Sequence, residues 1–345
     1  MGEKKLKILV LTGGESSERE VSLDSGRSVT AALLDEGHRV RVIDSLDGEI
    51  LAENTADFDS RMLTPPEDGN GLIRAIQDAR LDGYDVVFNS LHGGKGENGT
   101  LAALLEVLDM PYTGSPTAAS ALAMNKDISK RIMRTLGIAT ADWIKFDMPA
   151  GAKLDEVLPQ IIHQIKMETG ATPYPLIVKP NDGGSTVGLT LVEKEEDLEQ
   201  AFKDGFAVSS SVLVETYLEG REITFGVLDG EVLPPVEIQP THKLYDYTCK
   251  YTKGKSKYIC PAELDDAVHQ KLAIDASRFY QAIECRGYAR IDFIVAPTTQ
   301  YICLELNTLP GMTELSLFPM AAREAGLSFG ELLTRLCNIA LGSKK

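Results

Sequence analysis

The sequence has 345 residues, of which 43% are hydrophobic and 25% are charged, as in an ordinary globular protein. At roughly 150 residues per domain, this length predicts two or three domains with buried cores. The net charge of -16 argues against a nucleic-acid-binding surface, which needs clustered Lys and Arg. An uninterrupted apolar run long enough to cross a membrane is absent from the sequence, so we expect no membrane span.

Cysteine usage indicates the compartment. Five cysteines form no CxxC motif, which predicts a reducing, cytoplasmic environment without a disulfide framework or zinc site. The chain starts with MGEKKLKILVLTGG, whose apolar run is only about six residues long and lacks a small-residue cleavage site. We interpret this run as a first strand rather than a signal peptide.

The first part of the chain alternates strands and helices. Apolar strands are predicted at 7–12 and 39–43, with a helix at 21–36 between them, and a further strand at 85–89 precedes a helix at 100–108. Residues 45–70 are polar and irregular. The βαβ order predicts an α/β fold with a parallel sheet.

The later pattern is mixed. Helices are predicted at 125–136, 154–168, 194–203 and 265–284, strands at 175–179, 189–192, 212–215, 221–228, 231–238, 288–295 and 300–306, and two helices at the C-terminus. We place domain boundaries so that the domains cover residues 1–120, 121–215 and 216–345. The last two are expected to have α+β character.

Oxygen donors lie on two neighbouring strands near the C-terminus. Glu305 and Asn307 are two residues apart, so they share one face of a strand, and Asp292 on an antiparallel neighbour could meet them. Such a set suits one or two Mg²⁺ ions. The alternative is a solvated strand face. The flanking apolar residues are predicted to face the core: Ile291, Phe293, Leu304 and Leu306.

A glycine-rich loop at 181–188 lies between two predicted strands and follows Lys179. Gly183 and Gly184 allow backbone amides to turn toward an anion, and Ser185 adds a hydroxyl donor. The loop could therefore close over phosphate oxygens, although a plain hairpin turn is the better explanation of this loop taken alone. It matches neither of the common nucleotide-binding glycine motifs.

Residues 212–225 have a strand–linker–strand form. Glu215 could accept a hydrogen bond from an adenine amine, and Glu222 could bind ribose hydroxyls. The backbone of the residues between them could complete the adenine contacts. Surface acids on a hairpin are the alternative.

Two glycine-rich loops of the first unit should meet at the carboxyl edge of its sheet. The loop at 13–22 carries Glu18 and the loop at 91–100 carries His92, and a carboxylate there could hold a substrate ammonium. Helix capping by Ser22 and Glu97 is the simpler explanation.

A polar segment, YDYTCKY at 245–251, is rich in tyrosine and lysine. It is the composition expected of a lid that closes on a site, or of an ordinary exposed loop.

Taken in order, these motifs resemble the D-alanine–D-alanine ligases of the ATP-grasp superfamily over nearly the whole chain. The segments that carry the resemblance are GGESSEREVSLDSG, LHGGKGENGTLAALLE, PYTGS, MNKDISK, PLIVKPNDGGSTVG, ETYLEGREIT, YDYTCKY, RIDF and ELNTLPGMTELSLFPMAAREAG. The resemblance implies an ATP-grasp fold, in which a Rossmann-like N-terminal domain precedes two domains that clamp ATP between them.

The resemblance also implies roles for individual residues. Nucleotide contacts are expected from Lys126, Lys179, Gly184, Ser185, Glu215, Tyr217, Leu218, Glu222 and Lys250. Two Mg²⁺ or Mn²⁺ ions are expected on Asp292, Glu305 and Asn307.

For the amino-acid substrates, the resemblance implies that Glu18 and His92 hold the ammonium of the first D-alanine, and that Ser316 and Leu317 hold the carboxylate of the second. For catalysis, Glu18, Ser185 and Tyr251 would form a hydrogen-bonded chain that locks the lid. Lys250 would reach the transferred phosphate, while Arg290 and the Gly311 amide would stabilise an oxyanion.

The implied activity is the ATP-dependent ligation of two D-alanine molecules through an acyl phosphate, for peptidoglycan precursors, by a homodimer. The sequence leaves alternatives open: ligases that make D-Ala–D-Ser or D-Ala–D-lactate, another ATP-grasp ligase, a nucleotide-binding protein without catalysis, or a NAD-dependent dehydrogenase. Tyr251 argues against the lactate product, because the relatives that make it lack this tyrosine. Two departures from the family pattern are Asn98, where many relatives have Asp, and Gly183, where an acid is often found.

Overall fold

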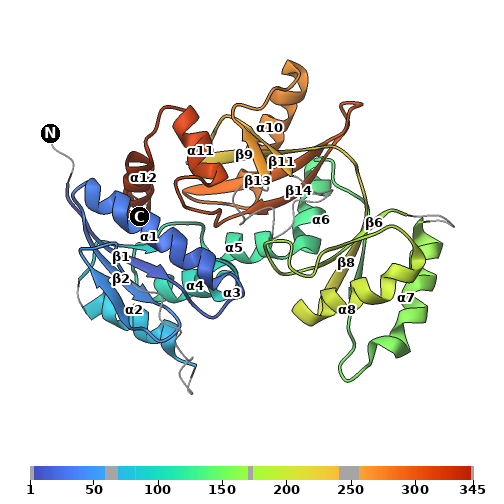
Figure 1. Ribbon diagram of the computed structural model, residues 1–345, viewed down its shortest axis with the longest axis horizontal. Coiled ribbons are helices and arrows are strands. Elements are labelled where there is room, and N and C mark those ends of the chain that lie inside the picture. Colours follow the sequence, from blue (N-terminus) through green and yellow to red (C-terminus); the bar gives the residue numbers. More distant parts are fainter. Residues whose placement is uncertain (1–3, 59–68, 82, 170–173, 241–255, 343–345) are drawn as a thin grey trace.

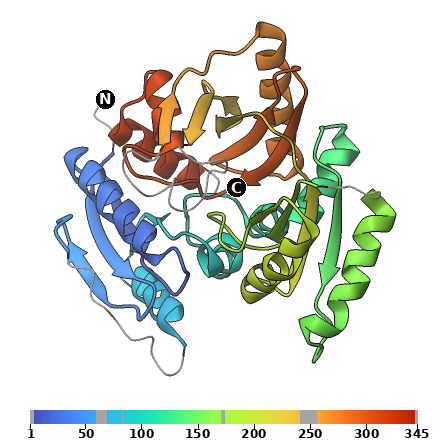
Figure 2. The same cartoon turned by 45° about the vertical axis from the view of Figure 1, so that its right-hand side comes forward.

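The computed structural model describes residues 4–58, 69–81, 83–169, 174–240 and 256–342 (Figure 1). Its strands form one mixed sheet of four strands, a central antiparallel sheet of four strands, and a third antiparallel sheet of six strands. Figures 1 and 2 show the first and central sheets in separate lobes on either side, with the third sheet between and above them.

The first sheet has the order β3-β2-β1-β4. Its strands are β1 (Lys7–Thr12), β2 (Arg39–Asp44), β3 (Ile50–Glu53) and β4 (Val86–Asn89). β1 pairs in parallel with β2 and β4, which confirms the predicted parallel arrangement, whereas β3 adds an antiparallel edge. β3 lies in the segment predicted to be irregular.

Helices cover both faces of this sheet, which explains why β1 is apolar throughout. Ile8 and Val10 face a core that contains α1 (Arg19–Asp35), whereas Leu9 and Leu11 face α2 (Gly71–Leu81) and α4 (Thr100–Val107). The short helix α3 (Gly94–Glu97) precedes α4.

The C-terminal helices complete the α1 face. α11 (Leu317–Glu324) and α12 (Phe329–Gly342) share one core with the first sheet and with two strands of the third sheet, β9 (Arg221–Leu228) and β13 (Tyr288–Val295). In Figure 1, α12 lies beside α1 although the two are separated by nearly the whole chain.

The central sheet has the order β5-β8-β6-β7, and all its pairs are antiparallel. Its strands are β5 (Trp143–Asp147), β6 (Leu176–Pro180), β7 (Thr190–Val192) and β8 (Ser211–Thr216). Its helices are α7 (Leu154–Thr169), the 3₁₀ turn η1 (Glu195–Asp197) and α8 (Leu198–Val208). β5 is the one strand of this sheet that the sequence patterns did not predict.

The third sheet has the order β12-β11-β9-β13-β14, with β10 paired to β9. Its strands are β9 (Arg221–Leu228), β10 (Glu231–Val232), β11 (Val236–Pro240), β12 (Ser256–Ile259), β13 (Tyr288–Val295) and β14 (Tyr301–Asn307). The single strand predicted at 231–238 is wrong. Pro234 and Pro235 cannot donate to a ladder, so they separate β10 from β11.

Three helices pack on the third sheet: α5 (Thr117–Met124), α6 (Lys126–Leu136) and α10 (Asp266–Ala282). Ala119 and Met133 belong to the same core as Phe279 and Phe293, although α5 and α6 precede the central sheet in the chain. Because helices on both sides of residue 120 share this core, the packing does not mark a boundary there, and the predicted domain boundaries at residues 120 and 215 stay predictions.

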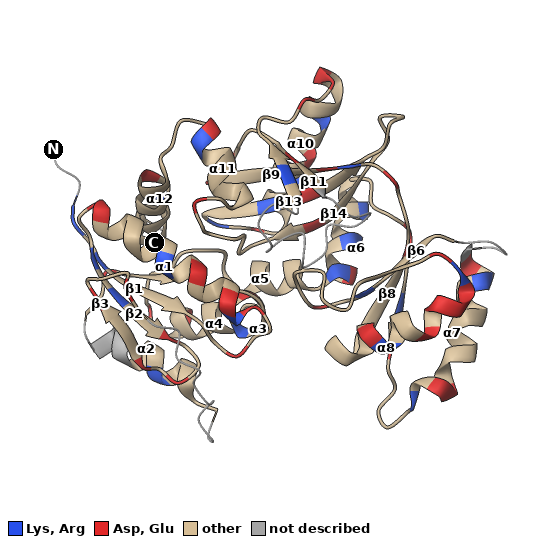
Figure 3. Cartoon of the chain, in the orientation of Figure 1, with Lys and Arg blue, Asp and Glu red and all other residues tan. Residues whose placement is uncertain are grey.

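In Figure 3, acidic and basic residues alternate along the described helices and strands of all lobes. None of the helices described is long and apolar enough to cross a membrane. Within the described ranges, the cysteines are free thiols: Cys260, Cys285, Cys303 and Cys337.

The aromatic core of the third sheet provides a test of the fold. Phe293 is fully buried and packs edge-on against Phe225, with ring centroids 6.0 Å apart. Phe293→Ala should lower the free energy of unfolding by about 3–5 kcal/mol, because it removes buried area and leaves a cavity. Urea unfolding measures this loss. Val107→Ala, at a site that is 82% exposed, is the control and should change stability by less than about 0.5 kcal/mol. Equal effects of the two substitutions would contradict the placement of Phe293.

Candidate functional site

Two cavities adjoin where the three sheets meet. The sheet cavity, of about 360 Å³, lies between the central and third sheets. The loop cavity, of about 620 Å³, lies between the loops of the first sheet and the end of the third sheet. They share five lining residues: Lys126, Gly183, Gly184, Ser185 and Glu305. A ligand in one cavity can therefore touch a ligand in the other.

Strands β13 and β14 bring the predicted oxygen donors together. In the antiparallel register, Asp292 lies opposite Glu305, and Arg290 lies opposite Asn307. Glu305 lines both cavities, Asp292 lines the sheet cavity, and Asn307 lines the loop cavity.

A β-bulge alters the predicted alternation of β14. The register shifts after Asp292, because Asp292 pairs with Glu305 but Phe293 pairs with Cys303. Leu304 is left without an opposite residue, and it lines the sheet cavity together with Glu305. The expectation that Leu304 faces the core is therefore wrong, whereas Leu306 is buried as expected.

Asp292 is held by its neighbours. Arg290 donates from Nε to Oδ1 and from a terminal nitrogen to Oδ2, at 2.9 and 2.8 Å, and Thr224 Oγ1 donates to Oδ1 at 2.6 Å. These bonds orient a carboxylate that is almost fully buried. Sequence reasoning did not identify Thr224, because only the pairing of β9 with β13 places it there.

Two carboxylates and one amide fit a divalent metal that takes further ligands from a phosphate. Among the described residues, no three His, Cys, Asp or Glu side chains form a complete protein cage. Hard oxygen donors of this kind suit Mg²⁺ or Mn²⁺.

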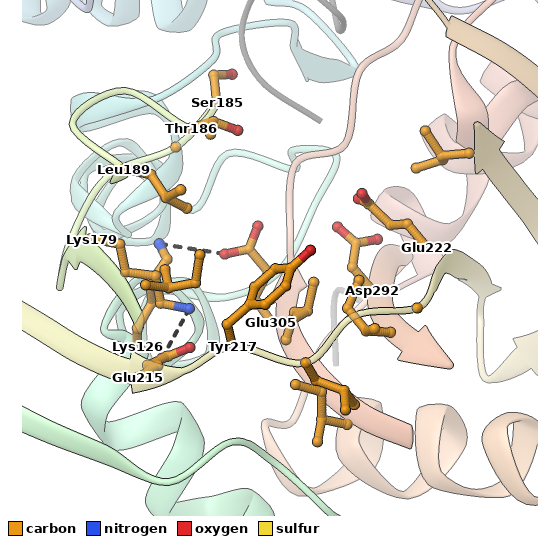
Figure 4. Close-up of a pocket in the computed structure, with 18 of the residues that line it drawn as sticks. Lys126, Lys179, Ser185, Thr186, Leu189, Glu215, Tyr217, Glu222, Asp292 and Glu305 are labelled. Atoms are coloured by element: carbon orange, nitrogen blue, oxygen red, sulfur yellow. Dashed lines mark ion pairs between the residues drawn. The ribbon is translucent and has the colours of Figure 1, made fainter. Parts of the chain in front are cut away.

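On the opposite wall, buried charges are paired. Lys179 lies 2.9 Å and Lys130 lies 3.1 Å from the same oxygen of Glu215, Oε1. Burial alone would raise the pKa of Glu215, but the two lysines outweigh it and hold that pKa below its usual value. Figure 4 shows Lys179 and Glu215 on one side of the cavity, and Glu222 and Asp292 on the other.

Apolar side chains form the rest of the sheet cavity. They come from β6, the β6–β7 loop, the β8–β9 linker and the third sheet: Ile177, Val187, Leu189, Leu218, Ile294, Ile302 and Leu304. Tyr217 and Leu218 lie in the predicted linker, and the Tyr217 ring extends into the space between the two walls in Figure 4. A flat aromatic group fits between such walls.

The predicted phosphate loop is a β6–β7 hairpin that also reaches the first lobe. Ser185 and Thr186 have positive φ angles of 50° and 64°, a conformation that costs free energy in residues other than glycine. Lys126 Nζ donates to the carbonyl of Gly183 at 2.6 Å and lies 3.5 Å from Glu305. The ammonium group of Lys126 thus connects the hairpin loop to Glu305 on β14.

Glu18 is the link to the first sheet. It is buried, and it accepts a hydrogen bond from the hydroxyl of Ser185. A Cβ atom at Gly93 would lie 2.7 Å from Glu18 Oε2, and one at Gly184 would lie 2.9 Å from it. Glycines from two different lobes therefore make room for one carboxylate.

His92 lies beside Glu18 in the loop cavity. Its Nε2 lies 2.9 Å from Ser25 Oγ. Burial lowers the pKa of His92, and the charge of Glu18 partly opposes this effect. The imidazole is therefore held neutral and serves as a hydrogen-bonding group.

The capping explanation of these loops holds only in part. Ser22 is not an N-cap: it lies inside α1, accepts from Gly13 N and donates to Ser90 O, each at 2.8 Å. Glu97 does lie in the first turn of α3, where it accepts from Gly93 N at 3.0 Å. Asn98 accepts from Thr100 N at 3.0 Å, a bond that Asp could also make.

The far end of the loop cavity is the N-terminus of α11. Ser316 is its N-cap residue, and Leu317 is its first residue. Ser316 Oγ accepts from Thr313 N at 3.1 Å, and Gly311 lies close to it. A helix N-terminus attracts carboxylates, so this end of the cavity suits an anion.

The structure brings together all the predicted site residues that it describes. Lys250 and Tyr251 lie outside the described residues. Sequence reasoning missed Lys130, although its position four residues after Lys126 places it on the next turn of α6.

Comparisons with known proteins agree with this geometry. Residues 7–115 match the family model "D-ala D-ala ligase N-terminus", and residues 132–338 match "D-ala D-ala ligase C-terminus". The chain is 41% identical over 330 residues to D-alanine–D-alanine ligase from Syntrophotalea carbinolica, covering 96% of this chain and 94% of the relative. It is also 41% identical over 330 residues to the ligase from Aquifex aeolicus, covering 95% of this chain and 99% of the relative.

Solved structures are similar as well. The D-alanine–D-alanine ligase from Bacillus anthracis complexed with ATP has a TM-score of 0.74 and 29% identity, with 98% of each chain covered. The VanG D-Ala:D-Ser ligase from Enterococcus faecalis has a TM-score of 0.76 and 28% identity, covering 98% of this chain and 100% of that one. The predicted ATP-grasp fold is confirmed.

Glu97 gives a pH-dependent test of the loop cavity. Burial, followed by the charge of Glu18, raises the pKa of Glu97 from 4.5 to about 8. Because the native state then holds the proton more tightly, Glu97 ionises in the unfolded chain at a lower pH than in the native state. The free energy of unfolding therefore falls as the pH rises from about 5 to 8. Glu97→Gln cannot ionise. It should therefore gain stability relative to the parent chain over this range, by at most about 1.4 kcal/mol per pH unit.

Urea unfolding of both proteins at several pH values checks this. Glu324→Gln, at an exposed position, is the control. A stability difference between Glu97→Gln and the parent chain that stays constant with pH would show that Glu97 is ionised throughout.

Proposed function

This chain belongs to the family of D-alanine–D-alanine ligases, and on that basis we propose that it joins two D-alanine molecules through an acyl phosphate, using ATP, to supply peptidoglycan precursors. The observation that carries the proposal is the shared boundary of the two cavities. Lys126, Ser185 and Glu305 stand between a slot suited to a nucleotide and a polar space suited to two amino acids.

ATP binds in the sheet cavity. The adenine ring lies between the apolar walls, where Glu215 and the backbone of Tyr217 and Leu218 contact its polar edge. Glu222 binds the ribose. The triphosphate extends toward Lys126, Lys179 and the hairpin, whose amides near Gly184 face it.

Asp292, Glu305 and Asn307 would hold one or two Mg²⁺ or Mn²⁺ ions. When bound, such ions neutralise charge on the phosphates. Arg290 orients Asp292 through two charged hydrogen bonds.

The first D-alanine binds with its ammonium on Glu18, beside the neutral His92. Its carboxylate attacks the γ-phosphorus of ATP, the bond to the β–γ bridging oxygen breaks, and ADP leaves. Ser185 holds Glu18 in place, and the predicted chain continues to Tyr251. Lys250 is proposed to reach the transferred phosphoryl group.

The second D-alanine places its carboxylate at the N-terminus of α11, on Ser316 and Leu317. Its free amine attacks the acyl carbon, and Arg290 and the Gly311 amide stabilise the oxyanion. Collapse of this intermediate breaks the carbon–oxygen bond, the nitrogen gives up one proton to the departing phosphate, and the dipeptide remains. Oxyanion donors of this kind contribute about 3–4 kcal/mol each.

D-serine is the second candidate for the second site, because a D-Ala:D-Ser ligase has a similar structure. The 41% identity to two D-alanine–D-alanine ligases favours D-alanine. We also propose a cytoplasmic homodimer. Free cysteines among the described residues are consistent with a reducing compartment.

Substrate-dependent phosphate release tests the activity. With ATP and Mg²⁺, D-alanine alone should release phosphate and yield D-alanyl-D-alanine, whereas L-alanine should not. Mixtures of D-alanine with D-serine or D-lactate, resolved by mass spectrometry, identify the second substrate. Phosphate release that needs no amino acid would refute the ligase assignment, and a predominant mixed product would replace D-alanine at the second site.

Two substitutions test the reacting groups. Arg290→Ala removes an oxyanion donor and the partner of Asp292, and Glu305→Gln removes the carboxylate that lines both cavities. Each should lower turnover by about 100-fold or more, which corresponds to about 3 kcal/mol. Thermal unfolding should show an intact fold, and Glu324→Gln should keep full turnover. Near-normal turnover of either variant would rule out the role assigned to that residue.

A further inference from the structure

Lys130 is a charged residue in an almost fully enclosed place. Its side chain, on α6, is 1% exposed. Its ammonium lies 3.1 Å from Glu215 Oε1 and donates to Thr140 Oγ1 at 2.8 Å. It also lies 5.2 Å from the centre of the Trp143 ring. A buried ammonium persists only with partners of this kind.

Its neighbours fix the direction of these bonds. Thr140 Oγ1 donates its proton to the carbonyl of Cys303 at 3.0 Å, so a lone pair of the hydroxyl faces Lys130. Lys130 is therefore anchored between the central sheet, through Glu215, and β14, through Thr140 and Cys303. It does not line the sheet cavity, so it is not in a position to bind a ligand there itself.

Lys179 approaches the same carboxylate oxygen from the cavity side. Its ammonium lies 2.9 Å from Glu215 Oε1, and unlike Lys130 it lines the sheet cavity. Two buried ammonium groups thus share one buried carboxylate; burial lowers the pKa of Lys130, and the charge of Glu215 opposes this effect. Two lysines thus surround a carboxylate that a single cation would neutralise.

This excess matters when a nucleotide binds. A phosphate in the cavity attracts Lys179 away from Glu215. If Lys179 were the only counterion, its departure would leave a buried carboxylate unpaired, which is strongly unfavourable. With Lys130 in place, Glu215 stays compensated whether Lys179 faces the carboxylate or a phosphate.

We propose that Lys130 is a positioning residue of the nucleotide site: as the permanent counterion of Glu215, it leaves Lys179 available to the phosphates of ATP. This inference rests on the proposed function, in which Lys179 binds phosphate. The electrostatics agree with it. The two lysines hold the pKa of Glu215 below its usual value despite burial, so the carboxylate is ionised and needs a counterion at neutral pH.

The test separates phosphate recognition from adenine recognition. The dissociation constants of adenosine and of MgATP are measured by calorimetry, and their ratio reports how much the phosphates contribute. In Lys130→Met, Lys179 becomes the sole counterion of Glu215, so the ratio should fall at least tenfold. Lys203→Met, which removes an exposed cation of α8, is the control and should leave the ratio unchanged.

A double substitution distinguishes this role from a merely structural one. Lys130→Met/Glu215→Gln removes the charge that retains Lys179, so the ratio should return to within about threefold of the parent value. An unchanged ratio in Lys130→Met, or an equal fall in the double variant, would overturn the inference.

Glu215→Gln alone keeps the test decisive if Lys130→Met fails to fold. It frees Lys179 while Lys130 remains, so the ratio should stay the same or rise, and a fall would overturn the inference. A parent protein that binds adenosine and MgATP equally would instead refute the phosphate role of Lys179 in the proposed function.

Discussion

Buried and half-buried opposite charges meet where the three sheets converge, and the site depends on their balance. Lys126 joins the β6–β7 hairpin to the third sheet through Gly183 and Glu305. Ser185 joins the same hairpin to the first sheet through Glu18. Removing such groups from water is costly, and it is offset only when each charge finds a partner. A polyanion with its metal ions fits this balance, because Lys179, paired with Glu215, lies on one wall, and the carboxylates of Glu222 and Asp292 lie on the other.

The sequence allowed most of the fold to be predicted where periodicity was strong. The bounds of strand β1 and of helix α1, which packs on the first sheet, agree closely with their hydrophobic patterns. β3 and β5 could not be predicted, because each has only four or five residues with charged side chains among them, and they become strands by pairing with β2 and β8. Their structure comes from tertiary contacts rather than local preference.

The site was predictable to the extent that strand geometry determines it. The two-residue spacing of Glu305 and Asn307 and the antiparallel neighbour carrying Asp292 were sufficient to bring the donors together. The bulge at Leu304 was not predictable, because it depends on how β13 and β14 pair after Asp292. Lys130 was missed for a similar reason. A lysine on a helix is usually solvated, and only the packing of α6 against the central sheet and β14 encloses this one.

Helix α12 follows the first sheet by more than two hundred residues but packs on it, and this affects the order in which the core of that sheet forms during synthesis. α12 covers the face of the first sheet that contains Ile8 and Val10, and it lies against α1. On a ribosome, the residues of β1 and α1 emerge before those of α12, whose side chains complete their core. Until residues 329–342 have been made, α12 cannot cover its part of this face, so some apolar surface of the first sheet stays exposed during synthesis.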